Sequence, residues 1–170
     1  SSQREIVHLE WLDNWYSVRS ARASPYRPDL FSHRRRRDAS PDVQQACAAA
    51  LRGNGAAYAP SYFWPLANGT GIELMEMCLP LTREGQPDGF LVATYSLAGL
   101  ITEMVPSESR RGQRIAWTEA DGTRLTIVGD VPVGTEVVHV TQLFDLPGAA
   151  FLLRLERPRE VRGWFTDVLT

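Results

Sequence analysis

Residues 71–106 read GIELMEMCLPLTREGQPDGFLVATYSLAGLITEMVP and carry the clearest secondary-structure pattern in the chain. Ile72 to Leu81 alternates apolar and polar residues over its first half, which predicts a strand with one buried face. Arg83 to Asp88 holds glycine, proline and aspartate, the residues that favour turns. Gly89 to Ser96 is rich in residues common in strands. Leu97 to Val105 has apolar residues at helical spacing and ends before a proline, so we expect an antiparallel hairpin that leads directly into a helix.

Two strands are expected near the N-terminus. Glu5 to Leu12 alternates in hydrophobicity, and the Asp13-Asn14 turn allows Trp15 to Ala21 to return as its antiparallel partner. Ser24 to Ser40 contains prolines and a run of arginines, which predicts a polar loop.

A helix and a third strand are expected next. Ser40 is a candidate N-cap before proline and aspartate, and the helix should run to about Arg52 with Gly53 as its cap. Ala56 to Trp64 reads as a strand in which Pro60 indicates an edge position or a bulge.

The chain beyond Pro106 predicts a second, smaller lobe without an internal helix. Four short strands are expected, in two hairpins: Arg114–Trp117 with Arg124–Val128, and Glu136–Phe144 with Ala149–Glu156. The predicted fold class is therefore α+β: a five-stranded antiparallel sheet with flanking helices over residues 1–106, a mostly-β lobe over 107–158, and a C-terminal helix over 159–170.

Charge and cysteine content exclude several classes of protein. The net charge is −2, and all 18 basic residues are arginine, so no overall positive field attracts nucleic acid or acidic lipid. We interpret Arg34 to Arg37 as part of a solvated loop rather than a nucleic-acid site. Cys47 and Cys78 are too few for a disulfide scaffold, and we expect two buried free thiols, although they could pair in an oxidising compartment.

Motifs of catalysis are missing from the sequence. The three histidines fall on separate predicted elements without metal-ligand spacing, and no phosphate-binding or nucleophile-elbow motif occurs. We therefore expect no catalytic residue, no metal site and no cofactor. No apolar run approaches the ~18 residues that span a bilayer, so any membrane attachment would come from flanking segments outside this chain.

The order strand, strand, helix, three strands, helix resembles the extracytoplasmic PAS-like domains, or Cache domains, of bacterial membrane-bound sensor proteins. Two stacked lobes with a smaller second lobe look like the periplasmic region of a sensor histidine kinase with a double Cache architecture. Such domains usually begin with a long helix, and we expect that helix to be absent or truncated in the sequence given. In amino-acid-sensing members an aspartate lies on the last strand of the distal lobe, within a pattern matched by Gly89 to Leu97, but Thr94 takes its place.

The resemblance implies a periplasmic signal-sensing domain of an inner-membrane protein that binds a small ligand in its distal lobe. It also implies a homodimer that relays a conformational change across the membrane. Two alternatives remain: a ligand-free domain for dimerisation or for sensing a partner protein, and a protein of a different class, either a small enzyme or a cytoplasmic PAS-type regulator.

Seven residues are candidates for contacting the ligand. Aromatic side chains on one side of the third strand would form a pocket wall, and residues of the hairpin would complete the pocket. Ordinary core packing or a solvated edge would explain the same patterns, and an isolated arginine is often a surface residue rather than a clamp for a carboxylate. The candidates are Tyr58, Tyr62, Trp64, Glu73, Met75, Thr94 and Arg19.

Overall fold

The computed structural model describes residues 5–26 and 36–159. The strands are β1 (Ile6–Leu12), β2 (Val18–Ala23), β3 (Ala57–Tyr58), β4 (Tyr62–Pro65), β5 (Gly71–Arg83), β6 (Gln86–Ser96), β7 (Arg114–Thr118), β8 (Arg124–Val128), β9 (Val137–Leu146) and β10 (Ala149–Pro158). The helices are α1 (Pro41–Gly53), α2 (Leu97–Met104) and α3 (Ser107–Arg110).

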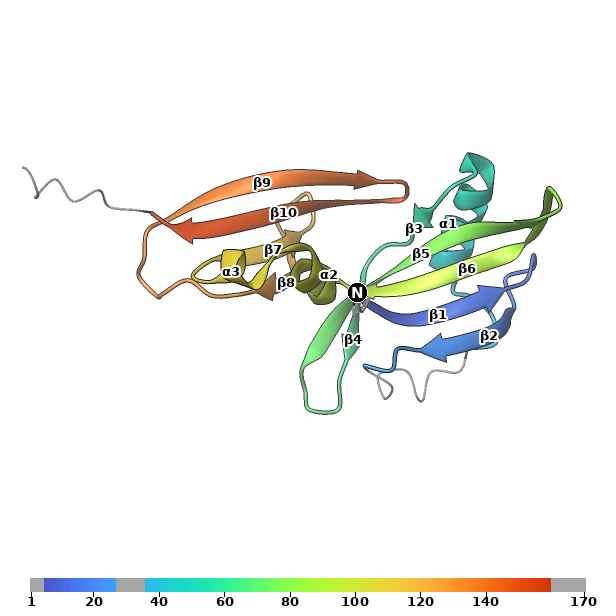
Figure 1. Ribbon diagram of the computed structural model, residues 1–170, viewed down its shortest axis with the longest axis horizontal. Helices are drawn as coiled ribbons and strands as arrows, with labels where there is room; N and C mark the ends of the chain where they lie inside the picture. Colours follow the sequence, from blue (N-terminus) through green and yellow to red (C-terminus); the bar gives the residue numbers. More distant parts are fainter. Residues whose placement is uncertain (1–4, 27–35, 160–170) are drawn as a thin grey trace, which may run out of the picture.

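These elements form two antiparallel sheets side by side, with α2 between them (Figure 1). The first lobe is a six-stranded sheet in the order β2-β1-β6-β5-β3, with β4 also paired to β5, and it carries α1. The second lobe is a four-stranded sheet in the order β8-β7-β10-β9. The predicted α+β class is confirmed, but the first sheet has six strands because the expected third strand is split into β3 and β4 around Pro60.

The hairpin predicted from residues 71–106 is present and runs straight into α2. β5 and β6 are longer than expected, since pairing continues past Pro80 through a register shift to a tight turn at Glu84 and Gly85, both with positive φ. The Ser96 hydroxyl accepts a hydrogen bond from the Gly99 amide and caps the start of α2. The strand therefore changes to helix without a loop, and this fixes α2 against the end of the sheet.

Helix α1 begins as its sequence predicts. The Ser40 hydroxyl accepts a hydrogen bond from the Val43 amide, and proline and aspartate follow in the first turn. Its end differs from the prediction, because Asn54, with φ 49°, takes the left-handed cap position instead of Gly53. The apolar side of α1 packs against the sheet in a core that includes Leu12 and Phe90.

The expectation of free thiols was wrong. Cys47 of α1 and Cys78 of β5 form a disulfide, with their Cα atoms 5.1 Å apart. The pairing could not be predicted from local sequence, because the two residues lie 31 positions apart and meet through the packing of α1 on β5. Disulfides persist chiefly in oxidising compartments.

The second lobe has the four predicted strands and a short helix, α3, that the sequence analysis did not expect. Glycines with positive φ occupy the turns of both hairpins, at Gly122 and Gly148. Residues 160–170, which hold nearly all of the expected C-terminal helix, lie outside the described residues. Within the described ranges, no helix is both long and apolar enough to cross a membrane.

Among the described residues, two hydrogen bonds join the lobes. The Tyr58 amide of β3 donates to the Pro147 carbonyl in the β9–β10 turn, at 2.8 Å. The indole Nε1 of Trp117 on β7 donates to the Leu97 carbonyl at the start of α2, at 3.0 Å. Helix α2 also contacts both sheets. These bonds join the lobes at two points, one at the β9–β10 turn and one at the start of α2.

The close contact between the β9–β10 turn and β3 predicts the effect of Gly148→Ala. A Cβ on Gly148 would lie 2.3 Å from the Tyr58 carbonyl oxygen, at a φ of +92°. We expect the steric clash in Gly148→Ala to lower the free energy of unfolding by about 1–3 kcal/mol in addition to the backbone strain, measured by urea denaturation. Gly134→Ala is the matched control, because Gly134 has a φ of +80° but open space around it. Equal losses in the two variants would contradict the close contact between the lobes.

Candidate functional site

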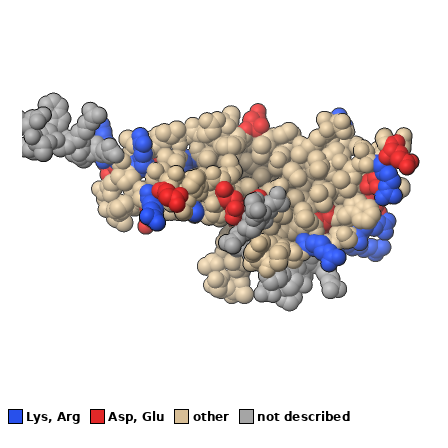
Figure 2. All heavy atoms as spheres, in the orientation of Figure 1, with Lys and Arg blue, Asp and Glu red and all other residues tan. Residues whose placement is uncertain are grey.

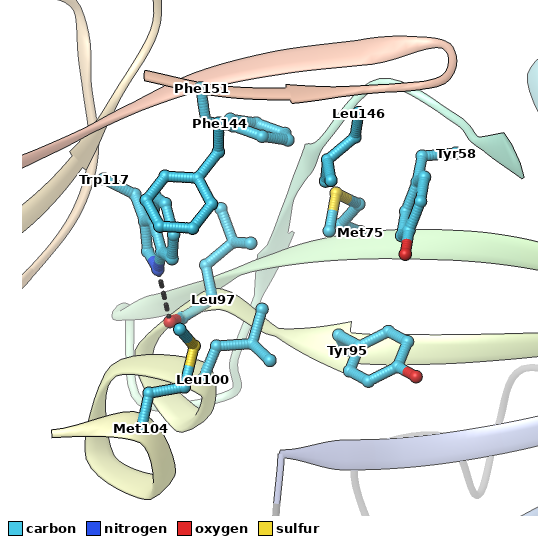
Figure 3. Close-up of a pocket in the computed structure, with 10 residues that line it drawn as sticks. All are labelled: Tyr58, Met75, Tyr95, Leu97, Leu100, Met104, Trp117, Phe144, Leu146 and Phe151. Carbon is cyan, nitrogen blue, oxygen red and sulfur yellow. Dashed lines mark hydrogen bonds between the residues drawn. The ribbon is translucent and has the colours of Figure 1, made fainter. Parts of the chain in front are cut away.

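A cavity of about 220 Å³ lies between the two lobes. Its walls come from β3, β5 and β6, from α2, and from β7, β9 and β10 (Figure 3). We call it the inter-lobe cavity. Its lining residues are Tyr58, Met75, Tyr95, Leu97, Leu100, Met104, Trp117, Phe144, Leu146 and Phe151.

The first lobe supplies one wall through strand pairing. Met75 of β5 and Tyr95 of β6 are cross-strand partners, so their side chains lie next to each other on one face of the sheet. Cys78, which is bonded to α1, points to the opposite face because side chains alternate along a strand. The cavity therefore lies on the face of the sheet away from α1. Leu97, Leu100 and Met104 of α2 extend this wall at helical spacing.

The second lobe supplies an aromatic wall. The ring of Trp117 meets Phe144 edge to face at 5.2 Å and Phe151 at 6.2 Å between centroids. The hydrogen bond from the indole Nε1 of Trp117 to the Leu97 carbonyl, drawn as a dashed line in Figure 3, fixes the indole against the start of α2. This arrangement satisfies the buried indole N–H while leaving apolar ring surface toward the cavity.

The polar groups of the side chains that line the cavity are few. Apart from the indole, they are the hydroxyls of Tyr58 and Tyr95, which lie on the same side of the cavity in Figure 3. Burial raises the pKa of Tyr95, and the neighbouring Tyr58 and the Glu5 carboxylate raise it further, so the phenol is neutral at physiological pH. None of the lining side chains is ionised, so the cavity presents apolar surface with two hydroxyls.

Only two of the seven predicted ligand residues line this cavity, Tyr58 and Met75. The prediction that Tyr62 and Trp64 share a side with Tyr58 was wrong. Four positions separate Tyr58 from Tyr62, while their partners on β5, Met77 and Leu74, are three apart. This extra residue moves the later side chains to the other face of the sheet.

Tyr62 and Trp64 pack instead on a small apolar cluster. That cluster is formed by Val7, Ile72 and Leu74 on the face opposite the inter-lobe cavity. The core-packing explanation that the sequence left open for these two aromatic residues therefore describes their surroundings, and any ligand contact by them stays a prediction.

The other three predicted residues also lie outside the cavity. Thr94 is fully buried and pairs with Glu76, which is adjacent to Met75 on β5. Thr94 therefore faces the side of the sheet opposite Met75, so the two residues do not line one pocket. Glu73 shares the face of Met75 but lies toward Ser61. The pKa of Glu73 is raised, chiefly by burial and also by the charge of Glu119, while a hydrogen bond with Ser61 acts in the opposite direction. Arg19 is exposed and ion-paired with Asp13. Ligand contacts by these residues also stay predictions.

Eight lining residues were missed by the sequence reasoning. Tyr95 follows Thr94 on a strand that was predicted correctly. The alternation of side chains along a strand therefore places Tyr95 on the face opposite Thr94, and this could have been read from the sequence. The aromatic residues of the second lobe, Trp117, Phe144 and Phe151, fell on three predicted strands. Nothing in the local pattern indicated that they face the first lobe.

A buried ionic cluster lies on the opposite face of the first sheet. Arg36 binds Glu10 through Nε, at 2.8 Å to Oε2, and Glu76 through Nη2, at 2.7 Å to Oε1. His8 lies 3.8 Å from Glu10. Burial alone would lower the pKa of Arg36, but the hydrogen bond to Glu10 and the charges of both carboxylates raise it above its ordinary value. We call these four residues the ionic cluster.

Comparisons with known proteins place the fold. No family model matches the chain, and no curated protein matches its sequence. The extracellular domain of a putative histidine kinase, vpHK1S-Z8, matches with a TM-score of 0.63 and 11% identity over 92% of this chain and 71% of that one. A putative sensory box/GGDEF family protein domain from Vibrio parahaemolyticus matches with a TM-score of 0.59 and 9% identity, over 92% and 73%.

A third match comes from a chemoreceptor. The ligand-binding domain of Pseudomonas fluorescens CtaA, in complex with L-alanine, matches with a TM-score of 0.53 and 16% identity, over 90% of this chain and 72% of that one. At these identities the likeness concerns the fold. The fold is that of the extracytoplasmic sensor domains of bacterial receptors, in agreement with the resemblance inferred from the order of elements.

Proposed function

We propose that this chain is the extracytoplasmic signal-sensing region of a membrane-bound bacterial receptor, a sensor histidine kinase, and that it binds a small molecule in the inter-lobe cavity. Binding would favour one arrangement of the two lobes and pass the change toward the membrane through the second lobe. The similar solved domains include a putative histidine kinase and a chemoreceptor that binds an amino acid, which supports a sensory role over a catalytic one.

The observation that carries this proposal is that the cavity walls come from both lobes. Tyr58 and Met75 belong to the first sheet, and Phe144 and Phe151 to the second. A ligand that touches both walls gains or loses contacts when the lobes move relative to each other. Only such a difference in affinity between two arrangements can shift their populations.

The two hydrogen bonds that join the lobes lie at the wall of the cavity, where a ligand could affect them. The β9–β10 turn contacts β3 through Pro147, and the strand before it contributes Leu146 to the cavity wall. Trp117 both lines the cavity and bonds to the start of α2. A ligand beside these groups would act directly on the two points that join the lobes.

The proposed location is the periplasm, with attachment to the inner membrane through flanking segments. The disulfide between Cys47 and Cys78 supports an oxidising compartment over the cytoplasm. Charged side chains of both signs are interspersed on the face of the molecule seen in Figure 2, which suits a soluble surface without affinity for nucleic acid.

A second candidate function is contact with a partner protein or with a second copy of this chain. β9 is at the edge of the second sheet and carries exposed apolar side chains, Val138, Val140 and Leu143. An edge strand with apolar residues is suited to pairing with another chain. We keep the homodimer as part of the proposal for this reason.

The test is ligand-induced stabilisation that depends on the cavity. A ligand at ~100 times its dissociation constant should add about 2.7 kcal/mol to the stability of the purified chain, visible as a rise in melting temperature. We expect Leu146→Trp, which fills the cavity, to abolish this rise. Leu143→Trp is the matched control on the same strand, at an exposed position.

Two results would contradict the proposal. Equal stabilisation of both tryptophan variants would place the ligand outside the cavity. A broad screen of small molecules that stabilises neither the wild type nor Leu143→Trp would favour the second candidate function. Circular dichroism of each variant before the screen establishes that it is folded.

A further inference from the structure

We infer that the inter-lobe cavity binds an uncharged molecule built on one aromatic ring with a single small polar group. This inference rests on the proposed function and adds the chemical class of the ligand. It follows from the charge, the size and the ring geometry of the cavity wall.

Charge comes first. None of the residues that line the cavity is ionised, so an ion entering it would lose hydration without gaining an opposite charge in contact. An anion would be disfavoured further by the Glu5 carboxylate, which is close enough to Tyr95 to raise the pKa of that phenol. Glu5 itself does not line the cavity, so a cation would gain attraction only at a distance. A neutral ligand avoids both costs.

Size limits the ligand to one ring. The cavity volume is about 220 Å³. In a protein interior an apolar cavity of about 150 Å³ holds benzene. The remaining volume accommodates a short substituent but not a second fused ring of similar size together with a side chain.

The wall favours an aromatic ring over an aliphatic chain. Trp117 already packs edge to face with Phe144 and Phe151, and a further ring can extend this arrangement. Met75 and Met104 bring two thioether side chains to the cavity, and sulfur makes favourable contacts with ring edges. An aliphatic ligand would gain the apolar burial but not these directional contacts.

The polar group of the ligand is expected to meet the two tyrosines. The indole N–H of Trp117 is already bonded to the Leu97 carbonyl, so it is not free for a ligand. The hydroxyls of Tyr58 and Tyr95 can each donate and accept a hydrogen bond. A hydroxyl on the ligand matches both roles, as in a phenol or a benzylic alcohol.

Three one-ring probes of similar size differ in charge: benzyl alcohol, benzylammonium and benzoate. We expect benzyl alcohol to bind the wild type at least tenfold more tightly than either ion, measured by calorimetry at pH 7. Toluene, which lacks the hydroxyl, measures the hydrogen bond. Tyr58→Phe or Tyr95→Phe should weaken benzyl alcohol about fivefold, the value of a typical net hydrogen bond, and leave toluene unchanged.

The outcomes separate this inference from the proposed function. If benzylammonium or benzoate binds more tightly than benzyl alcohol, and Leu146→Trp abolishes that binding, the ligand class is wrong and the sensing cavity stands. If no probe binds the wild type better than Leu146→Trp, the ligand class is overturned, and the broad screen with Leu146→Trp and Leu143→Trp then decides separately whether the cavity binds a ligand. Because the tyrosine variants remove only one oxygen atom, their loss of binding is read on a folded protein.

Discussion

Arg36→Met is expected to lower the free energy of unfolding by about 3–5 kcal/mol at pH 7, the usual cost of removing one partner of a buried ion pair. Glu10 and Glu76 are each 4% exposed, and Arg36 bonds to both. Methionine fills similar space but removes the guanidinium that bonds to both buried carboxylates. Urea denaturation at pH 7 measures the loss.

Two controls show that the loss comes from uncompensated charge. Arg19→Met removes an exposed ion pair with Asp13, and pairs of that kind contribute about 0–1 kcal/mol. Arg36→Met combined with Glu10→Gln and Glu76→Gln should recover much of the loss, because neutral amides need no cation. A loss no larger than that of Arg19→Met would contradict the buried cluster.

The ionic cluster has a structural role that explains this size of effect. The residues after Arg36 run beside β2 and the turn before it, with the Val18 amide donating to the Arg37 carbonyl and the Ala39 amide to the Tyr16 carbonyl. They lead directly into Ser40 and α1. Arg36 thus fixes the point at which the chain crosses to the face of the sheet that α1 covers. Its loss should loosen the first lobe without touching the inter-lobe cavity, which is on the other face.

Local signals in the sequence were enough to predict the central hairpin and the starts of α1 and α2. Turn residues at Gly85 and the capping serines at Ser40 and Ser96 act within a few positions of themselves, so their effects can be read directly. The four strands of the second lobe were predictable for the same reason, with Gly122 and Gly148 marking their turns.

The contacts that build the ionic cluster and the inter-lobe cavity depend instead on residues far apart in the chain. Arg36 lies 26 positions from Glu10 and 40 from Glu76, and a run of four arginines does not indicate which one is buried. Tyr58 and Tyr62 face opposite sides because of one extra residue near Pro60, and the sequence left open whether that proline marks an edge position or a bulge. The aromatic wall around Trp117 arises only where two lobes meet.

Reduction of the Cys47–Cys78 disulfide is expected to lower the free energy of unfolding by about 3–4 kcal/mol. The bond closes a segment of 31 residues, and the chain-entropy estimate for a loop of that length is about 3.7 kcal/mol. Urea denaturation with and without dithiothreitol measures this loss. The variant Cys47→Ala with Cys78→Ala should be destabilised to a similar degree and should not respond to the reductant. A wild type whose midpoint is unchanged by dithiothreitol, with thiols titrating as free before reduction, would show that the cysteines are unpaired and would remove the support they give to a periplasmic location.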